Sequence, residues 1–262
     1  AIVFQGAGKA FVAGADIRYF VEKIKAGRIP DIVAFTRKGH ELLLRIEESQ
    51  KLTIALLDGL SLGGGSELAL ACQAIVATSA GSMAFPETGI GIFPGLGGML
   101  RTARHVGPEL AKYFAFTGAY ISAADAQALG IVTRLVEPAA VEAAIRDLAA
   151  QGRPDKYRPR ELPAKFKPFA ELFSGAAVAT LLAGKAPASA NAELAAKVLK
   201  TLGFKAPAAL RIANEIIDRQ AGLAMRDAVE AELGRLAEIF ETADALEGLS
   251  TVGRRRPEFK GK

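Results

Sequence analysis

The stretch that decides the fold is Leu60-Ser-Leu-Gly-Gly-Gly-Ser-Glu-Leu-Ala-Leu-Ala-Cys72. An apolar run over 52–57 leads into it and predicts a buried strand, which Asp58-Gly59 ends. Three glycines follow, and the residues from Leu68 to Cys72 favour a helix. The first turn of a helix leaves backbone N–H groups without internal partners, and glycine lets a ligand approach them closely. This turn suits an oxygen that gains negative charge in a reaction, with Glu67 beside it as a candidate acid or base.

Two other interpretations of this stretch compete with an oxyanion site. Glycines between a strand and a helix are more often a sign of tight packing. Gly59-Leu-Ser-Leu-Gly63 also matches the G-x-S-x-G nucleophile elbow of hydrolases in its strand-turn-helix context. The elbow needs Asp and His partners later in the chain, and His105 is the only downstream histidine. Nothing in the sequence distinguishes His105, or the upstream His40, from a surface residue, so the elbow is the weaker interpretation.

Composition narrows the class of protein. The chain has 262 residues, half of them hydrophobic, and a single cysteine, Cys72, which fits a reducing compartment. No apolar run approaches the ~20 residues of a membrane span, and no signal peptide is present, so we expect a cytoplasmic protein without membrane contact. The net charge of +5 suits anionic ligands such as phosphates, but there is no tryptophan and no concentrated basic face. We therefore expect no nucleic-acid partner, and no metal site.

The first part of the sequence predicts a strand and two helices. Ala1–Gln5 has a buried-strand pattern without a leader, which suggests that the chain begins inside a longer protein. Small residues at 13–15 run into a helix over 18–27, with Asp16 near its positive end. A longer amphipathic helix starts at Pro30. Its predicted apolar side consists of Ile32, Phe35, Leu42, Leu43 and Ile46.

A loop dense in glycine and proline holds the second candidate carboxylate. After a short strand over 74–78, the run Met83–Gly98 precludes regular structure over most of its length and contains one carboxylate, Glu87. Glu67 and Glu87 could form a pair whose pKa values are pushed apart. Alternatively, Glu87 merely caps a turn. Further along, the sequence predicts helices over 99–105 and from Ser122 to Gly130, and a strand over 131–136.

From about residue 140 the pattern is helical. An extended linker is expected over 151–168, because it contains four prolines. The expected helices cover 169–182, 192–202, 208–217 and 223–240. The C-terminal run 254–262 is rich in basic residues, which indicates either a solvated tail or a segment that contacts a phosphate group.

In this order, these elements resemble the crotonase (enoyl-CoA hydratase/isomerase) superfamily. The matching motifs are Ala13-Gly-Ala-Asp16, Gly63-Gly-Gly-Ser-Glu67, Phe85-Pro-Glu87 followed by Pro94-Gly-Leu-Gly-Gly98, Thr117–Ala126, Gly130-Ile-Val132, and the ending from Glu247 to Lys260. The resemblance implies an α/β fold with a spiral of ββα repeats, followed by C-terminal helices that pack a homotrimer or hexamer. It implies a spiral core over 1–140, a helical insert over 141–197 and an oligomerisation region over 198–262. The family's N-terminal strands are expected to be missing, so the first strand would lack one of its neighbours, and an unpaired strand edge invites aggregation.

The resemblance also assigns roles at the site. The family's oxyanion hole falls on the N–H groups of Ala15 and Gly64, which would polarise the thioester carbonyl of an acyl-CoA. Glu67 would activate the water at C3, Glu87 would protonate C2, and Gly95 would position the water. The further substrate-binding residues implied are Ala13, Asp16, Ile17, Phe259 and Lys260. Coenzyme A is part of the substrate, and no other cofactor is expected.

Keeping both Glu67 and Glu87 favours a hydratase of 2-enoyl-CoA. Isomerases of the family usually retain only the match to Glu87, and the 3-hydroxyisobutyryl-CoA hydrolases lack the match to Glu67. The helices over 152–197 nevertheless resemble that hydrolase. They also resemble the hydratase half of fusions with 3-hydroxyacyl-CoA dehydrogenase that act in fatty-acid β-oxidation. No GxGxxG of a dehydrogenase is present in these residues. A thioester hydrolase, an isomerase and a non-catalytic acyl-CoA-binding subunit remain alternatives.

Overall fold

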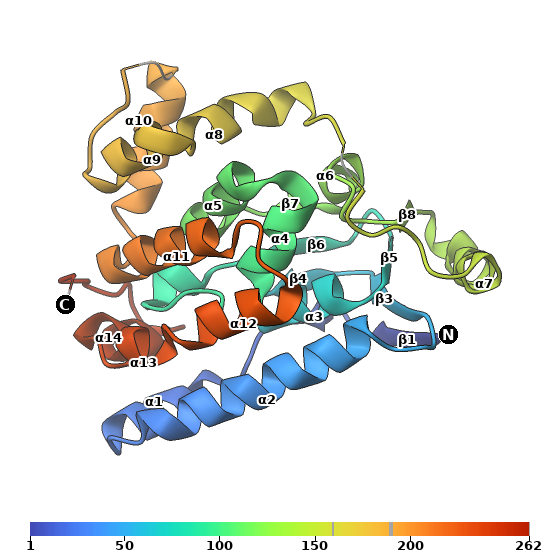
Figure 1. Ribbon diagram of the computed structural model, residues 1–262, viewed down its shortest axis with the longest axis horizontal. Coiled ribbons are helices and arrows are strands. Elements are labelled where there is room, and N and C mark those ends of the chain that lie inside the picture. The colour runs from blue at the N-terminus through green and yellow to red at the C-terminus, as the bar shows by residue number, and fades with distance from the viewer. Residues whose placement is uncertain (159, 189–190, 262) are drawn as a thin grey trace.

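The structure, a computed structural model, describes residues 1–158, 160–188 and 191–261. Its strands form two sheets of four, in the orders β1-β3-β5-β8 and β2-β4-β6-β7 (Figure 1). The strands are β1 Ile2–Gln5, β2 Ala10–Val12, β3 Thr53–Leu57, β4 Leu60–Leu62, β5 Ala74–Ala77, β6 Ser82–Ala84, β7 Ile121–Ser122 and β8 Arg134–Leu135.

The chain alternates between the two sheets as it advances. Each of the pairs β1–β2, β3–β4 and β5–β6 contributes one strand to each sheet, and helices follow each pair. All pairings are parallel except β6–β7, and the register joins Ile2 to Thr53 and Ile54 to Ala74. The repeated step of two strands and a helix is the expected ββα spiral, so the predicted fold class is confirmed.

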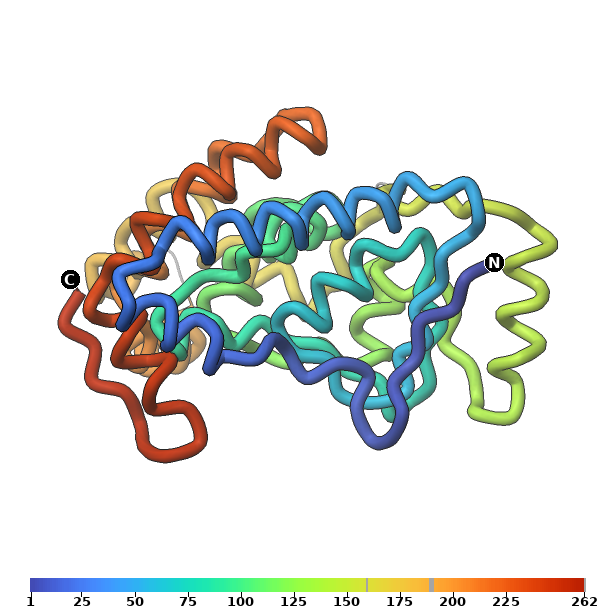
Figure 2. Tube along the Cα trace, turned by 90° about the horizontal axis from the view of Figure 1, so that it is seen from below, coloured from blue at the N-terminus to red at the C-terminus, as the bar shows by residue number. Residues whose placement is uncertain are grey.

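Helices surround the sheets and extend the molecule away from them (Figure 1). The helices are α1 Ile17–Lys25, α2 Ile29–Glu47, α3 Gly64–Ala71, α4 Gly98–Val106, α5 Pro108–Thr117, α6 Ala123–Ala128, α7 Val141–Gln151, α8 Lys167–Leu172, α9 Gly175–Leu182, α10 Ala192–Leu202, α11 Pro207–Gln220, α12 Met225–Leu233, α13 Leu236–Phe240 and α14 Ala243–Thr251. Short 3-10 turns are η1 Glu87–Ile90, η2 Pro138–Ala140 and η3 Ala164–Phe166. The two ends of the described chain lie at opposite ends of the molecule (Figure 2). No helix among the described residues combines the length and the apolar character that crossing a bilayer requires.

Several predicted boundaries were wrong. Helix α3 begins at Gly64, four residues earlier than expected, and Leu60–Leu62 before it is a strand of its own. The expected strand over 131–136 shrinks to Arg134–Leu135. The predicted helix over 169–182 is interrupted before Gly175, where φ is +41°. Its residues fall into α8 and α9, because the extended backbone of Ser174 (φ −90°, ψ 147°) and the positive φ of Gly175 do not continue a right-handed helix.

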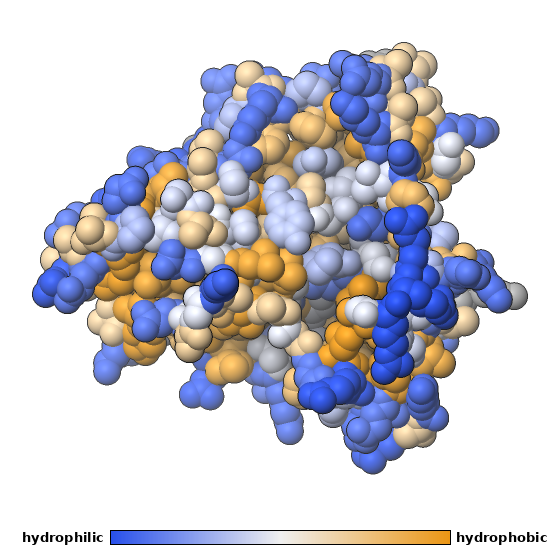
Figure 3. Space-filling view, turned by 180° about the vertical axis from the view of Figure 1, so that it is seen from behind, coloured by the Kyte–Doolittle hydropathy of each residue, from blue (hydrophilic) through white to orange (hydrophobic). Residues whose placement is uncertain are grey.

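The buried face of α2 also differs from the prediction. Ile32, Leu43 and Ile46 are buried as expected, but Phe35 is 49% and Leu42 is 55% exposed. In their place Thr36 and His40 face inward. The exposed large apolar side chains are Ile2, Val3, Phe35, Leu42, Tyr120, Phe204, Leu223 and Val252. Apolar areas also interrupt the charged surface on the face seen in Figure 3.

Candidate active site

A cavity of about 470 Å³ lies where the β2–α1 loop, the β4–α3 corner, η1 and the loop before α4 meet. Seven of the ten residues that the sequence predicts for the site line it: Ala13, Ala15, Ile17, Gly64, Glu67, Glu87 and Gly95. They come from four separate segments of the chain. The fold therefore brings most of the predicted site together around one cavity.

The β4–α3 corner requires its glycines for close packing. Gly63 has φ +50°, and a Cβ there would lie 2.3 Å from Oε1 of Glu87. A Cβ on Gly65 would lie 2.0 Å from the carbonyl oxygen of Val12. Tight packing and an exposed backbone, proposed above as alternatives, thus occur together. The close packing presses the corner against the end of β2 and against Glu87.

Three backbone amides at the cavity are available to a ligand. The N–H groups of Ala15, Gly64 and Gly95 have no hydrogen-bond partner among the described residues. Gly64 opens α3, and the first N–H groups of a helix have no partner within it. All three residues line the same cavity, so an oxygen bound there could accept from more than one of them.

Glu67 is held rigidly in the first turn of α3. It is 2% exposed, and its Oε1 accepts from the N–H groups of Leu96 at 2.7 Å and of Gly98 at 2.9 Å. Burial raises the pKa of Glu67 to about 7, helped by the negative charge of Glu232 and opposed by the two N–H donors. Its carboxylate form is therefore present at and above neutral pH, as a base requires.

Glu87 opens the turn η1 and shares the cavity. It is 7% exposed, and its Oε2 has no hydrogen-bond partner among the described residues, so this oxygen caps no turn. Burial and then the negative charge of Glu67 raise the pKa of Glu87 well above its ordinary value, while the positive charge of Lys205 opposes the rise. Because the negative charge of Glu67 raises the pKa of Glu87, the two carboxyl groups lose their protons in turn. Glu67 ionises first and Glu87 keeps its proton, so the pair offers a base and an acid at one pH.

The structure does not bring three predicted residues to this cavity. Asp16 is exposed and caps α1 by accepting from the N–H and side chain of Arg18. Phe259 packs against the helical core, and Lys260 lines a different hollow of about 700 Å³ beside α14. A helix N-terminus is where an Asp commonly caps, so the position of Asp16 has a structural reason. Substrate contact for these three residues stays a prediction.

Sequence reasoning missed buried polar groups beside the site. His40 was expected at the surface, but it is 1% exposed and its Nε2 lies 2.9 Å from the carbonyl oxygen of Gly95. The spacing of Ile32, Thr36, His40 and Leu43 places them on one helical face, and that signal could have found His40. Glu232 and Arg101, both fully buried, were not singled out at all.

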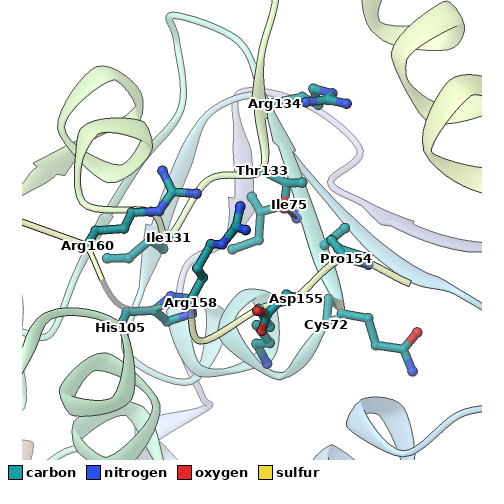
Figure 4. A pocket seen from close by; sticks show the side chains of 14 residues that line it. Cys72, Ile75, His105, Ile131, Thr133, Arg134, Pro154, Asp155, Arg158 and Arg160 are labelled. Carbon is teal, nitrogen blue, oxygen red and sulfur yellow. Dashed lines mark hydrogen bonds between the residues drawn. The ribbon is translucent and has the colours of Figure 1, made fainter. Parts of the chain in front are cut away.

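The nucleophile-elbow interpretation was wrong. Ser61 lies in β4 rather than on the turn, is fully buried, and does not line the cavity. His105 lines a separate cavity of about 210 Å³ near the start of β5, surrounded by basic side chains that include Arg134, Arg158 and Arg160 (Figure 4). Since Ser61 is fully buried and lines neither cavity, whereas His105 lines the smaller one, the two cannot act on one substrate.

The fold and the paired glutamates place the chain in the class of crotonase-fold proteins. A family model for enoyl-CoA hydratase/isomerase matches residues 1–260, and the chain belongs to this family. The resemblance stated from the motifs is confirmed at that level.

Relatives carry two kinds of activity in their names. A short-chain-enoyl-CoA hydratase of Clostridium acetobutylicum is 37% identical over 150 residues, which are 57% of this chain and 56% of that protein. The chain thus spans little more than half the length of this relative. A mitochondrial 3-hydroxyisobutyryl-CoA hydrolase of Xenopus laevis is 31% identical over 96% of this chain and 69% of its own length. A crystal structure of an enoyl-CoA hydratase from Rhodobacter sphaeroides has a TM-score of 0.81 at 27% identity, covering 99% of this chain and 78% of that chain.

Proposed function

We propose that this protein is an enoyl-CoA hydratase that adds water across the 2,3 double bond of a 2-enoyl-CoA thioester. The observation that carries the proposal is the pair of buried glutamates, Glu67 and Glu87, at one cavity with unpaired backbone amides. A base and an acid at one site match the two proton transfers of a hydration.

The oxyanion hole would consist of the N–H groups of Ala15 and Gly64. Both would donate to the thioester oxygen, where negative charge collects as water attacks the conjugated double bond. Removing one such donor typically costs ~3 kcal/mol of transition-state stabilisation. Since backbone donors do not reorganise, this stabilisation is available at the moment of reaction.

The two glutamates would move the protons. Glu67, as carboxylate, takes a proton from the water held by the Gly95 N–H while the water oxygen bonds to C3. The π electrons shift onto the thioester oxygen as an enolate. When the enolate reverts to the thioester carbonyl, its electrons move to C2, and C2 takes the proton of Glu87. The addition leaves Glu67 protonated and Glu87 ionised. Transfer of one proton from Glu67 to Glu87 then restores the starting protonation states of the two residues.

The walls of the cavity suit an acyl chain. Its apolar lining includes Phe20, Phe93, Leu236 and Phe240. The carbonyl of Ala13, which lines the cavity, would accept from the adenine amino group of coenzyme A. Burial of an apolar acyl chain against these side chains stabilises the complex by roughly 25 cal/mol per Å².

One assay tests this function against its alternatives. The protein is given crotonyl-CoA, and loss of the conjugated double bond is followed while free thiol is monitored. Hydration without thiol release supports the proposal. Thiol release would instead indicate a hydrolase, in line with the name of the Xenopus relative. Binding without either reaction would indicate a non-catalytic acyl-CoA-binding subunit, and migration of the double bond in a longer 3-enoyl-CoA would indicate an isomerase.

Finer parts of the proposal follow from the resemblance. They are a role in fatty-acid β-oxidation, fusion or association with a 3-hydroxyacyl-CoA dehydrogenase, assembly as a trimer or hexamer, and location in the cytoplasm. The division at residues 140 and 197 into core, insert and oligomerisation region belongs to the same proposal. The exposed apolar side chains Phe204, Leu223 and Val252, all in the proposed oligomerisation region, support a partner surface there.

A further inference from the structure

The loop 95–98 is held by three side chains in addition to Glu67. The carbonyl oxygen of Gly95 lies 2.9 Å from Nε2 of His40, and that of Leu96 accepts from Nη1 of Arg101 at 3.2 Å. The N–H of Gly97 donates to Oε1 of Glu232 at 2.7 Å. These three side chains come from α2, α4 and α12, so helices distant in sequence converge on four residues.

Three successive amides in this loop alternate between two carboxylates. Leu96 and Gly98 donate to Glu67, and Gly97 between them donates to Glu232. The orientation of each peptide depends on that of its neighbours, because the chain has few free dihedral angles. Holding the middle amide on one side therefore helps to direct the flanking amides to the other side.

Glu232 has contacts that fix it in place. It is 0% exposed, its Oε1 lies 3.2 Å from Nε2 of His40, and its Oε2 accepts from Nε2 of Gln220 at 3.2 Å. It does not line the cavity. A buried carboxylate is costly unless hydrogen bonds or charges compensate it, and here these partners do so.

We propose that Glu232 is a positioning residue for the hydration: it holds Gly97 so that the neighbouring amides of Leu96 and Gly98 face Glu67. This inference rests on the proposed function, since it concerns the base of that reaction. Glu232 acts through the loop and through its charge, without touching the substrate.

Few titratable groups surround Glu67, so the charge of Glu232 has a clear effect on the pKa of Glu67. Glu87 faces it from η1, His40 from α2 and Glu232 from α12. Arg101 of α4 is paired with Glu47 at 2.9 Å. The strands packed on α3, which are β2, β3 and β4, carry no titratable side chain. After burial, the charge of Glu232 contributes most to raising the pKa of Glu67.

The test replaces Glu232 by Gln, which keeps an oxygen acceptor for Gly97 and removes the charge. We expect the acid limb of the kcat–pH profile to move to lower pH by about one unit, because Glu67 then ionises more easily. KM for crotonyl-CoA should change little, because Glu232 does not line the cavity. Glu230→Gln is the matched control: it removes one charge from the exposed face of the same helix, where Glu230 pairs with Arg37, and should leave the profile in place.

A second readout needs no activity. The titration of Glu67 is followed by NMR in protein carrying 13C-labelled glutamate, with the signal assigned from Glu67→Gln. A lower midpoint in Glu232→Gln than in the unaltered protein supports the inference, and equal midpoints overturn it. If the unaltered protein hydrates no enoyl-CoA, the proposed function fails while this titration still decides the role of Glu232. Glu232→Ala should lose kcat that Gln restores in large part, and equal kcat in Ala and Gln variants would contradict the hold on Gly97.

Discussion

At the scale of single residues, Glu67 and Glu87 differ in environment although their chemistry is the same. Glu67 accepts two backbone N–H bonds, whereas Oε2 of Glu87 has no partner among the described residues. The N–H donors favour the charged form of Glu67, and the charge of Glu67 favours the neutral form of Glu87. Environment therefore separates a base from an acid.

The first prediction concerns these two carboxyl groups. Glu67→Gln and Glu87→Gln should each lower the rate of crotonyl-CoA hydration by about 10²–10⁴-fold, because each removes one proton transfer. The affinity for coenzyme A should stay close to that of the unaltered protein, as measured by calorimetry. Ser61→Ala, a change at a fully buried side chain nearby, is the control and should alter the rate little. Full activity in either glutamine variant would end the two-glutamate mechanism.

The second prediction concerns Lys205, whose charge affects the pKa of Glu87. Its positive charge lowers the pKa of Glu87, against the larger effects of burial and of Glu67. Lys205→Met should therefore raise the pKa of Glu87 further and extend activity to higher pH, since Glu87 must hold a proton to act as an acid. The measurement is the alkaline limb of the kcat–pH profile. Lys200→Met, at an exposed position on α10, is the control, and the same alkaline limb in both variants would contradict a role for Lys205.

At the scale of elements, the β4–α3 corner depends on contact between α3 and β2. Gly65→Ala would place a Cβ 2.0 Å from the carbonyl oxygen of Val12, and backbone cannot move aside as a side chain can. We expect a loss of about 1–3 kcal/mol in the free energy of unfolding, measured with urea. Gly64→Ala is the matched control, because a Cβ there would meet only a side-chain carbon of Leu96 at 3.8 Å. Equal stability of the two variants would show that α3 can shift without cost.

At the scale of the whole molecule, one buried carboxylate joins distant parts of the chain. Glu47 at the end of α2 pairs with Arg101 of α4 at 2.9 Å and with Lys156 at 2.9 Å, and it accepts from the hydroxyl of Tyr157 at 2.7 Å. Although burial acts to raise it, these positive charges hold the pKa of Glu47 below its ordinary value. The segment after α7 is thereby fastened to the core.

This network predicts a pH dependence of stability. A lowered pKa in the folded state gives stability that is present above the unfolded pKa, near 4.5, and is lost as pH falls through the folded pKa. Glu47→Gln should lower the free energy of unfolding at pH 7 by about 3–5 kcal/mol, because Arg101 and Lys156 lose their partner. It should also flatten the loss of stability in acid, as followed by urea unfolding from pH 7 to 3. Glu142→Gln, which breaks only an exposed pair with Arg146, should cost under ~1 kcal/mol. Parallel pH curves for the unaltered protein and Glu47→Gln would rule the network out.

The sequence predicted elements well where local patterns govern them. The apolar run before Asp58 and the caps at Asp16 and Ser122 specify local backbone geometry. It failed where a glycine-rich run could be loop or helix. Gly64 and Gly65 have low intrinsic helix propensity, yet both lie in α3, where Gly65 packs against Val12 at the end of β2.

What the sequence by itself determined is the buried strands before Asp58 and over 74–78 and the two glutamates in glycine-rich settings, because these signals are local. The ββα order was implied by the resemblance of motifs that are ordered along the chain. Only the tertiary structure decided that His40, Arg101 and Glu232 surround the loop 95–98, and that Glu67 and Glu87 share one cavity. The physical reason is that burial and electric charge act through space. Residues far apart in the chain, such as Glu67 and Glu232, influence each other's ionisation only after packing has removed the water between them.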